Sequence, residues 1–255
     1  PCGSALGLEL YWSLHLSPHF KVFGGSSVED HGAFVYKTYL GNLPRVTDPD
    51  FIEQVNKVID EREIDFIIPA HDDVLLKLAQ AKAAGQLRCE LISSELATCE
   101  IARSKLNTYE FFKDIIPVPK VYKTSNDVQL FPVFLKPEIG QGTKGTYVAK
   151  DAKDIEFYRA KDPSLLILEY LPGKEYTVDC FTTKEGKLLF AEGRERTRIL
   201  NGISVSSRTV KDGRFNKLAE TINNKLKFRG VWFFQVKEDK DGELVLMEIA
   251  PRVAG

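Results

Sequence analysis

The sequence predicts an α/β half followed by an α+β half, and three observations carry this prediction. In the first hundred residues, amphipathic helical patterns alternate with short apolar runs, as in a doubly wound parallel sheet with helices on both faces. From residue 131 onward, strands with period-2 alternation and tight turns predict antiparallel sheets. Pro117 and Pro119 separate the two patterns, and we predict domains at 1–98 and 99–255.

Each element of the first half rests on a local apolar pattern. Residues 51–62 have apolar side chains at helical spacing, with Asp48 or Asp50 as the cap. Residues 65–69 form a short apolar run and predict a buried strand. The same reasoning predicts a helix at 6–14, a strand at 20–23, a helix at 74–84, a strand at 91–92 and a helix-rich segment at 95–113. Because the chain begins at Pro1, we expect that preceding sequence, including a first strand, is missing.

Composition narrows the class of protein. The chain has 255 residues, of which 43% are hydrophobic and 28% charged, as is ordinary for a globular protein of one or two domains. Its net charge of −1 gives no general attraction to nucleic acid, and no apolar run is long enough to span a bilayer. Four scattered cysteines without a C-x-x-C spacing favour reduced thiols over zinc or disulfides. We therefore expect a cytoplasmic protein without nucleic-acid or membrane partners.

The strongest local signal is a glycine-rich loop between two predicted strands within residues 131–150. Glycines such as Gly140 and Gly142 let backbone N–H groups turn inward, and Thr143 adds a donor, which suits a polyphosphate. Lys136 lies inside the preceding apolar strand, where its charge needs a partner that a phosphate would supply. A strand rather than a helix follows the glycines, so this is not a P-loop. A plain hairpin is the alternative.

Carboxylates lie at the end of the next apolar strand and along the strand after it. Glu169 ends an apolar run, which is a costly place for an unpaired charge. Glu175, Thr177 and Asp179 alternate along the following strand and therefore share one face. A carboxylate on that face would accept the hydroxyls of a ribose. For Asp179, a structural role as an acceptor of backbone hydrogen bonds is an equal alternative.

Three arginines, Arg194, Arg196 and Arg198, alternate along a further predicted strand. They would line one face and bind phosphates or a substrate carboxylate. Solvent-exposed positions on an edge strand are the favoured alternative.

The last two predicted strands flank Asp241 and Gly242, a favoured two-residue hairpin turn. Counting outward from this turn places Gln235 opposite Glu248, on the same face of the hairpin. Amide and carboxylate oxygens are ligands suited to Mg²⁺, so the pair is a candidate metal site. A simple Gln–Glu hydrogen bond is the alternative.

Taken in order, these segments resemble the ATP-grasp superfamily, most closely its carbamoyl-phosphate-synthase-like branch. The resemblance covers nearly the whole chain. Residues 1–98 are similar to the doubly wound domain that precedes the grasp, and residues 99–255 to the ATP-grasp domain with its antiparallel sheets. The order and spacing of the motifs together are fairly specific.

The resemblance implies a role for each matching residue, with ATP and Mg²⁺ as cofactors. Lys105 and Lys136 would contact the ATP phosphates, and Arg252 would stabilise the transferred γ-phosphate, so Lys136 and Arg252 are the candidate catalytic residues. The phosphate lid would include Gly140, Gly142 and Thr143, and the hinge that binds adenine would be Glu169, Tyr170 and Leu171. Glu175 would bind the ribose, and Gln235 and Glu248 would be the metal ligands.

Three positions depart from the family pattern. The family has asparagine at the position of Ala250, where it holds a second metal, and aspartate at the position of Ser104. Ala250 has no oxygen to offer, so affinity for a second metal should fall. The chain also stops at Gly255, where the family continues, so we expect the C-terminal part of the ATP-grasp domain to be incomplete.

The sequence thus predicts an ATP-dependent ligase that activates a small-molecule carboxylate as an acyl phosphate for attack by an amine. An ATP-binding but catalytically silent regulatory or partner-binding module is the alternative, and Ala250 favours it. A dinucleotide-dependent oxidoreductase fits less well, because the first glycines have an unhelpful spacing. Tyr11 and Trp12 fit either a core or a homodimer interface, which leaves the oligomeric state open.

Overall fold

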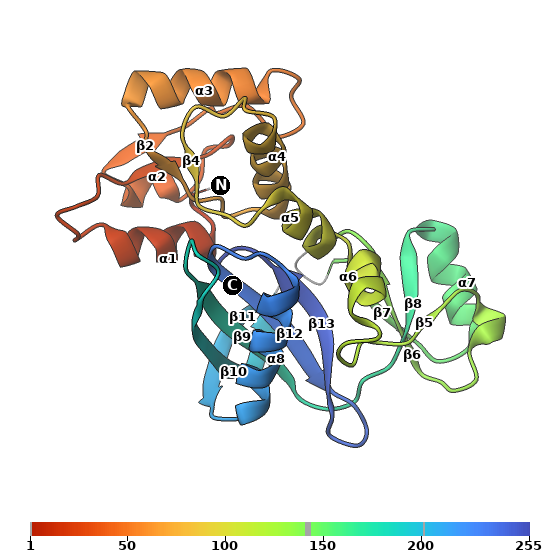
Figure 1. The fold of residues 1–255 in the computed structure, drawn as a ribbon. Coiled ribbons are helices and arrows are strands. Elements are labelled where there is room, and N and C mark those ends of the chain that lie inside the picture. The colour runs from red at the N-terminus through yellow and green to blue at the C-terminus, as the bar shows by residue number, and fades with distance from the viewer. Residues whose placement is uncertain (1, 141–143, 201) are drawn as a thin grey trace.

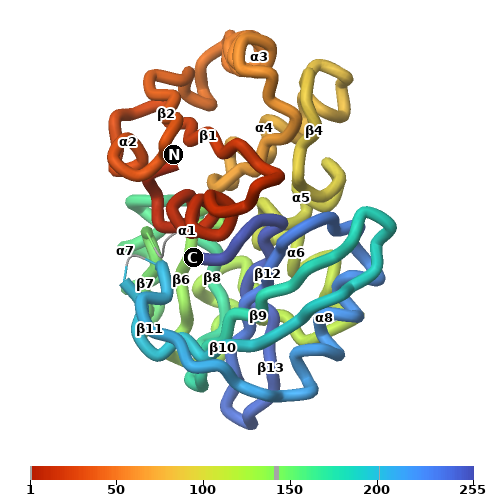
Figure 2. The backbone as a smooth tube through the Cα atoms, turned by 90° about the vertical axis from the view of Figure 1, so that its left-hand side faces the viewer, coloured from red at the N-terminus to blue at the C-terminus, as the bar shows by residue number. Residues whose placement is uncertain are grey.

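The computed structural model describes residues 2–140, 144–200 and 202–255 and folds them into an N-terminal lobe and two sheets (Figure 1). The smaller sheet lies to one side, and the larger sheet lies beneath the N-terminal lobe. In Figure 2 the end of the chain lies beside helix α1 (Ala5–Leu14), where Gly255 approaches Leu6. The N-terminal lobe therefore contacts the larger sheet near the C-terminus.

The N-terminal lobe is built from short parallel strand pairs and the helices that cover them. Strand β1 pairs with β2, and β3 with β4, in both cases parallel. The predicted parallel pairing is present as two separate pairs, and a single doubly wound sheet is not confirmed. The elements after α1 are β1 (Phe23–Gly25), α2 (Gly32–Val35), β2 (Thr38–Leu40), α3 (Phe51–Arg62), β3 (Phe66–Ile67), α4 (Asp72–Ala83) and β4 (Glu90–Leu91).

Helix α3 has the bounds that its apolar pattern predicts. It ends where Glu63 adopts the left-handed conformation (φ 52°, ψ 53°), a conformation that stops an α-helix. Its residues Phe51 and Ile59 are buried in one core with Leu75 and Leu78 of α4. The predicted helix at 74–84 is α4, which begins two residues earlier, at Asp72.

Two consecutive helices, α5 (Leu96–Arg103) and α6 (Lys105–Phe112), connect the N-terminal lobe to the sheets. Ser104 has an extended backbone and separates them, and its hydroxyl accepts a hydrogen bond from the backbone N–H of Asn107 at 3.1 Å. This N-cap explains why the helix-rich segment 95–113 is two helices rather than one.

The smaller sheet has the antiparallel strand order β5-β8-β6-β7. Its core contains Val133, Leu135 and Ile167 of the strands, with Ile155 of the covering helix α7. The elements are β5 (Val121–Tyr122), the short 3-10 helix η1 (Ser125–Asp127), β6 (Val133–Pro137), β7 (Tyr147–Ala149), α7 (Ala152–Lys161) and β8 (Leu165–Glu169).

The larger sheet has the antiparallel order β11-β10-β9-β12-β13, and helix α8 covers one of its faces. Trp232 and Phe234 of β12 pack there against Phe215 and Ile222 of α8. Because side chains alternate along a strand, the residues between these lie on the opposite face. The elements are β9 (Glu175–Thr182), β10 (Leu188–Leu200), β11 (Ile203–Val210), α8 (Gly213–Lys225), β12 (Gly230–Glu238) and β13 (Leu244–Ala250).

The last hairpin has the predicted pairing but not the predicted turn. Glu238 pairs with Leu244, so the prediction of a two-residue turn at Asp241 and Gly242 is wrong. The Asp239 carboxylate instead accepts backbone hydrogen bonds from Asp241 and Glu243, which holds a wider loop. A bulge between the paired residues then shifts the register by one residue, and Gln235 does lie opposite Glu248.

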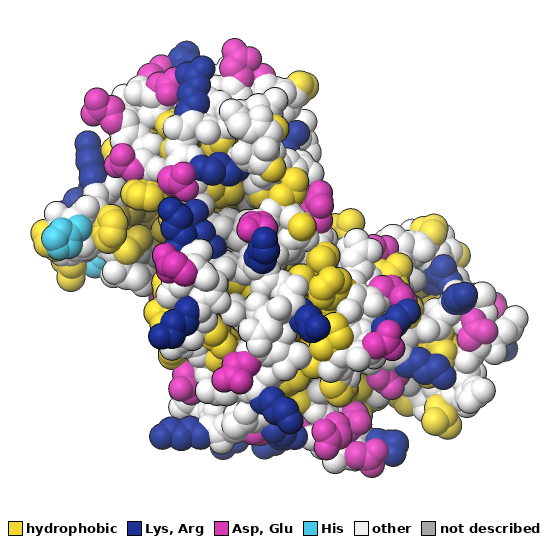
Figure 3. Space-filling view, viewed as in Figure 1, with side chains coloured by type: hydrophobic (Ala, Val, Ile, Leu, Met, Phe, Trp, Pro, Cys, Tyr) yellow, Lys and Arg dark blue, Asp and Glu magenta, His cyan; other side chains and the backbone are white. Residues whose placement is uncertain are grey.

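In the described parts of the chain, no helix combines the length and apolar character needed to cross a membrane. The face of the molecule shown in Figure 3 carries basic and acidic side chains interspersed over all lobes. Charge on this face is therefore mixed and not gathered into a patch of one sign.

Candidate functional site

The face of the larger sheet opposite α8 carries a row of polar side chains. Strand register places Arg194, Thr177, Gln235 and Glu248 side by side across β10, β9, β12 and β13. Thr177 is completely buried, yet its Oγ1 has no hydrogen-bond partner among the described atoms. A buried hydroxyl without a partner is costly, which indicates a face built to receive a polar ligand.

Lys136 projects from β6 into this region and is only 9% exposed. Burial lowers its pKa to about 8, although the nearby carboxylates of Glu248 and Glu175 act in the opposite direction. Within residues 2–140, 144–200 and 202–255, Lys136 forms no ion pair. A buried ammonium without a counterion is well placed to attract an anion.

Lys105, the first residue of α6, lies at the start of the glycine loop. Its Nζ donates to the backbone carbonyls of Glu138 and Gly140 at 3.4 and 3.3 Å. Burial lowers the pKa of Lys105, against the opposing charge of Glu248. The predicted lid residues Gly142 and Thr143 lie outside the described residues. Of the three residues predicted for the lid, the structure describes Gly140.

The three arginines of β10 do not act as one set. Arg196 has a side chain only 3% exposed and forms an ion pair with Glu175 of β9. Arg194 pairs with Asp179 at 2.7 Å, while a register shift after Arg196 leaves Arg198 exposed.

Strand β10 lies inside the sheet, so the edge-strand interpretation is wrong for Arg194 and Arg196. The same-face prediction holds for Glu175 and Asp179, because both carboxylates meet arginines on that face. For Asp179, its partner is a guanidinium rather than the backbone N–H groups of the alternative interpretation.

The predicted adenine hinge connects the smaller sheet to the larger one, between β8 and β9. The Glu169 carboxylate accepts a hydrogen bond from the backbone N–H of Lys120 at 3.1 Å, so it is already used to hold β5 and β8 together. Tyr170 is partly exposed, with the Lys237 ammonium 6.0 Å from its ring centre, and Leu171 is buried. The hinge therefore offers backbone groups and apolar surface rather than a free carboxylate.

Comparison with known proteins identifies this arrangement. A family model described as "ATP-grasp in the biosynthetic pathway with Ter operon" matches residues 161–255. D-alanine–D-alanine ligases from Petrotoga mobilis and Thermotoga petrophila are 27% and 25% identical over 99 and 101 residues. Each match covers 36% of this chain and 33% of the relative, so the chain aligns with about a third of those proteins.

Solved structures match nearly the whole chain. N5-carboxyaminoimidazole synthetase from Staphylococcus aureus, complexed with ADP, has a TM-score of 0.77 at 18% identity, covering 99% of this chain and 69% of that one. The biotin carboxylase domain of Hydrogenobacter thermophilus 2-oxoglutarate carboxylase has a TM-score of 0.75 at 13% identity, covering 96% and 61%. The chain has the ATP-grasp fold. The predicted resemblance to the ATP-grasp superfamily is thereby confirmed.

In this ATP-grasp fold, Arg252 is held by a residue that the sequence did not single out. Its Nε and Nη2 donate to the two carboxylate oxygens of Asp72, at the start of α4. Burial lowers the pKa of Arg252, but the hydrogen bonds and charge of Asp72 outweigh it and raise the pKa. No sequence signal links two residues so far apart, and Asp72 by itself resembles an ordinary first-turn acid of a helix.

A small cavity of about 20 Å³ lies between Asp72, the ion-pair partner of Arg252, and Glu248 of the polar face. Its lining includes Asp72, Lys105, Gly140, Glu248 and Ala250, so it joins the N-terminal lobe to the candidate metal and phosphate ligands. Ala250 is buried and contributes no oxygen, as predicted from its side chain.

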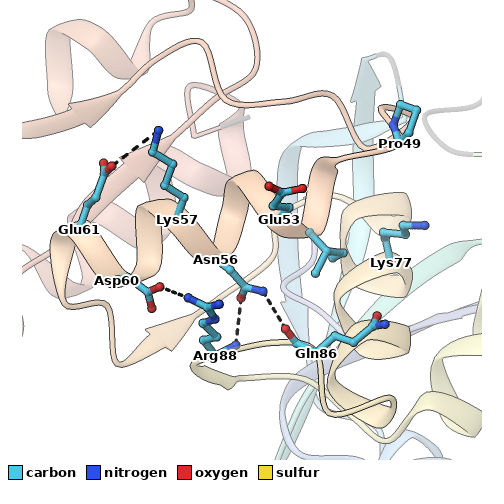
Figure 4. A pocket seen from close by; sticks show the side chains of 10 residues that line it. Pro49, Glu53, Asn56, Lys57, Asp60, Glu61, Lys77, Gln86 and Arg88 are labelled. Atoms are coloured by element: carbon cyan, nitrogen blue, oxygen red, sulfur yellow. Dashed lines mark hydrogen bonds and ion pairs between the residues drawn. The ribbon is translucent and has the colours of Figure 1, made fainter.

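A larger depression of about 730 Å³ lies elsewhere, along α3 (Figure 4). Four of its charged side chains form ion pairs, Lys57 with Glu61 and Arg88 with Asp60. Asn56 in its wall is satisfied by the backbone of Gln86 and Arg88. Because the charged side chains of the depression are exposed to water, we assign the candidate site to the polar face of the larger sheet and not to this depression.

Proposed function

We propose that this protein is an ATP- and magnesium-dependent ligase that joins a small carboxylate to an amine. The observation that carries the proposal is the buried ammonium of Lys136, which has no ion-pair partner among the described residues, beside a row in which the Thr177 hydroxyl has no hydrogen-bond partner among those residues. The similarity to D-alanine–D-alanine ligases supports the reaction class. We also propose that residues 1–98 and 99–255 act as separate domains.

The side chains fit ATP and magnesium in the proposed roles. Lys136 and Lys105 would hold phosphates, and Gln235 and Glu248 offer the hard oxygen donors that Mg²⁺ prefers. When bound there, magnesium supplies positive charge that neutralises the phosphates. The hinge at 169–171 would receive adenine, and Glu175 would accept ribose hydroxyls beside its partner Arg196.

The proposed reaction has two steps. An oxygen of the substrate carboxylate attacks the γ-phosphorus of ATP, the bond to the β,γ-bridging oxygen breaks, and ADP leaves. The amine then attacks the acyl carbon, phosphate leaves with the bonding electrons, and the amine loses a proton. Lys136 and Arg252 would stabilise the negative charge of the phosphoryl group by position and electrostatics, without any covalent role.

A catalytically silent nucleotide-binding module is the second candidate, and Ala250 favours it. The asparagine that the ATP-grasp pattern has at position 250 would supply a side-chain oxygen to a second metal ion, and alanine does not. A cytoplasmic location and a homodimer also stay predictions. The biotin carboxylase domain of Hydrogenobacter thermophilus, one of the structural neighbours, is a dimer.

Trapping the acyl phosphate with hydroxylamine separates the two candidates. Protein, MgATP and a panel of small carboxylates are incubated with hydroxylamine, and hydroxamate and ADP are measured. A ligase forms both in equal amounts with at least one carboxylate, and Arg252→Ala loses the signal. MgATP binding without ADP release for any carboxylate would instead support the silent module.

A further inference from the structure

We propose that Asp72, from the N-terminal lobe, is a positioning residue that holds Arg252 in the orientation in which it contacts the terminal phosphate of the nucleotide. The inference rests on the proposed ATP site and assigns to the N-terminal lobe a part in that site. Asp72 itself touches no nucleotide in this arrangement. It acts through Arg252.

The ion pair between the two side chains has a specific geometry. Asp72 binds the Nε and Nη2 side of the guanidinium, with Nη2 donating to Oδ2 at 2.8 Å, and Nη1 donates to the Val253 carbonyl at 2.9 Å. A guanidinium has five N–H donors, and these three hydrogen bonds use three of them. The other two N–H groups have no partner among the described residues. Those two donors are enough for a phosphate oxygen pair, the arrangement that arginine favours.

The surroundings fix Arg252 in this orientation. Its guanidinium carbon lies 5.3 Å from the centre of the Phe233 ring, and its side chain is only 10% exposed. The Asp72 side chain is 14% exposed, so water competes little for the ion pair. With a ring, a carboxylate and a carbonyl holding it, the side chain has little freedom to turn away.

Asp72 is itself rigid. It begins the twelve-residue helix α4, whose N-terminus favours a negative charge, and α4 is anchored in the core through Leu75 and Leu78. Burial raises the pKa of Asp72, but the hydrogen bonds and charge of Arg252 outweigh it, so the carboxyl stays ionised.

The pair lies at the right place to influence the site. Asp72, Lys105, Gly140 and Glu248 line the same small cavity, and the charge of Glu248 acts on Arg252. Ala250 lines it as well and has no polar side-chain atom. With alanine in place of an asparagine at position 250, recognition of the terminal phosphate therefore depends more strongly on the orientation of Arg252.

The test compares the affinities for two probes, the magnesium complexes of ADP and of the non-hydrolysable β,γ-imido analogue of ATP. Their ratio reports contacts to the terminal phosphate and needs no knowledge of the acyl substrate. Calorimetry is run on the whole chain, with thermal unfolding recorded for each variant. The variants are Asp72→Asn, Arg252→Ala, the double variant, and Asp60→Asn, which removes an aspartate–arginine pair far from the site.

Asp72→Asn is expected to reduce the preference for the ATP analogue about tenfold, while ADP affinity stays within about twofold. In the Arg252→Ala background the same change is expected to have no further effect on the ratio, because Asp72 acts only through Arg252. Asp60→Asn is expected to keep the wild-type ratio. Asp72→Glu, which keeps the charge, should restore part of the preference.

Three results would overturn the inference. An unchanged ratio in Asp72→Asn would show that Arg252 needs no positioning, and a higher ratio would show that Asp72 competes with the phosphate. An equal loss in both backgrounds would show that Asp72 acts structurally. Absence of nucleotide binding by the wild type would reject the proposed function as well, which distinguishes that failure from failure of the inference alone.

Discussion

Two regions of the molecule are rich in charged side chains, but only one of them buries a charge without an ion-pair partner among the described residues. Along the α3 depression, the side chains of Arg88 and Asp60 are 61% and 47% exposed and pair with each other. On the polar face of the larger sheet, Lys136 is buried and has no ion-pair partner in the described parts of the chain. We therefore take buried charge without an ion-pair partner, rather than the volume of a depression, as the criterion for the candidate site.

The largest expected effect in this comparison comes from Glu248, whose charge acts on both lysines of the site. Glu248→Ala should lower MgATP affinity about a hundredfold, because a metal ligand is lost. Glu243→Ala, an exposed carboxylate in the turn of the same hairpin, is the matched control and should leave affinity unchanged. Isothermal titration with MgATP measures both, and equal losses would contradict the assignment.

The pH dependence of binding is the next largest effect. Lys136 attracts phosphate only when protonated, and its pKa is about 8, so the protonated fraction falls as pH rises through that value. MgATP affinity should therefore fall by about tenfold per pH unit above 8. Lys136→Arg stays charged throughout and should flatten the profile between pH 7 and 10. A wild-type profile that is flat over the same range would count against the role of Lys136.

Thr177 tests the cost of the unsatisfied hydroxyl. Thr177→Val removes Oγ1 while keeping the shape, and should raise the free energy of unfolding of the ligand-free protein by about 1 kcal/mol. The same variant should bind MgATP a few-fold more weakly. Chemical denaturation and calorimetry measure the two effects, and a variant that is less stable but binds normally would mean that the hydroxyl serves the fold.

The smallest effect is expected in the α3 depression. Asp60→Asn breaks an exposed ion pair and should change the free energy of unfolding by less than about 0.5 kcal/mol. Nucleotide affinity should not change. A loss of nucleotide binding in this variant would move the site to the depression and reverse the comparison.

Local patterns in the sequence predicted the long helix well and the short strands less well. The expected buried strand at 65–69 is β3, where Phe66 is 53% exposed, and the strand expected at 20–23 lies at Phe23–Gly25. The helix at 51–62 follows from its apolar spacing, since its buried residues lie on one face. The Gln235–Glu248 pairing was also predicted, although the turn was wrong. The Asp239 side chain widens the loop, and a bulge beside Met247, whose carbonyl accepts a hydrogen bond from Tyr109, restores the register. Neither compensation is visible in a period-2 pattern.

Long-range pairing could not be predicted. The alternation of side chains predicts which face of its own strand each of Glu175 and Arg196 occupies. The ion pair between them also requires that β9 lies beside β10, and the alternation does not reveal this strand order. Asp72 and Arg252 are 180 residues apart, and neither residue's neighbours in the sequence point to the other. The roles predicted for the site residues remain predictions, which binding measurements can test.

The most direct test of the central claim is calorimetric titration of MgATP into the wild type, Lys136→Ala and the control Lys77→Ala. Lys77 is an exposed lysine of α4 in the wall of the depression. We predict saturable binding by the wild type and Lys77→Ala, and loss of at least about a hundredfold in affinity for Lys136→Ala. Wild-type affinity in Lys136→Ala, or no binding of MgATP by the wild type, would contradict the account.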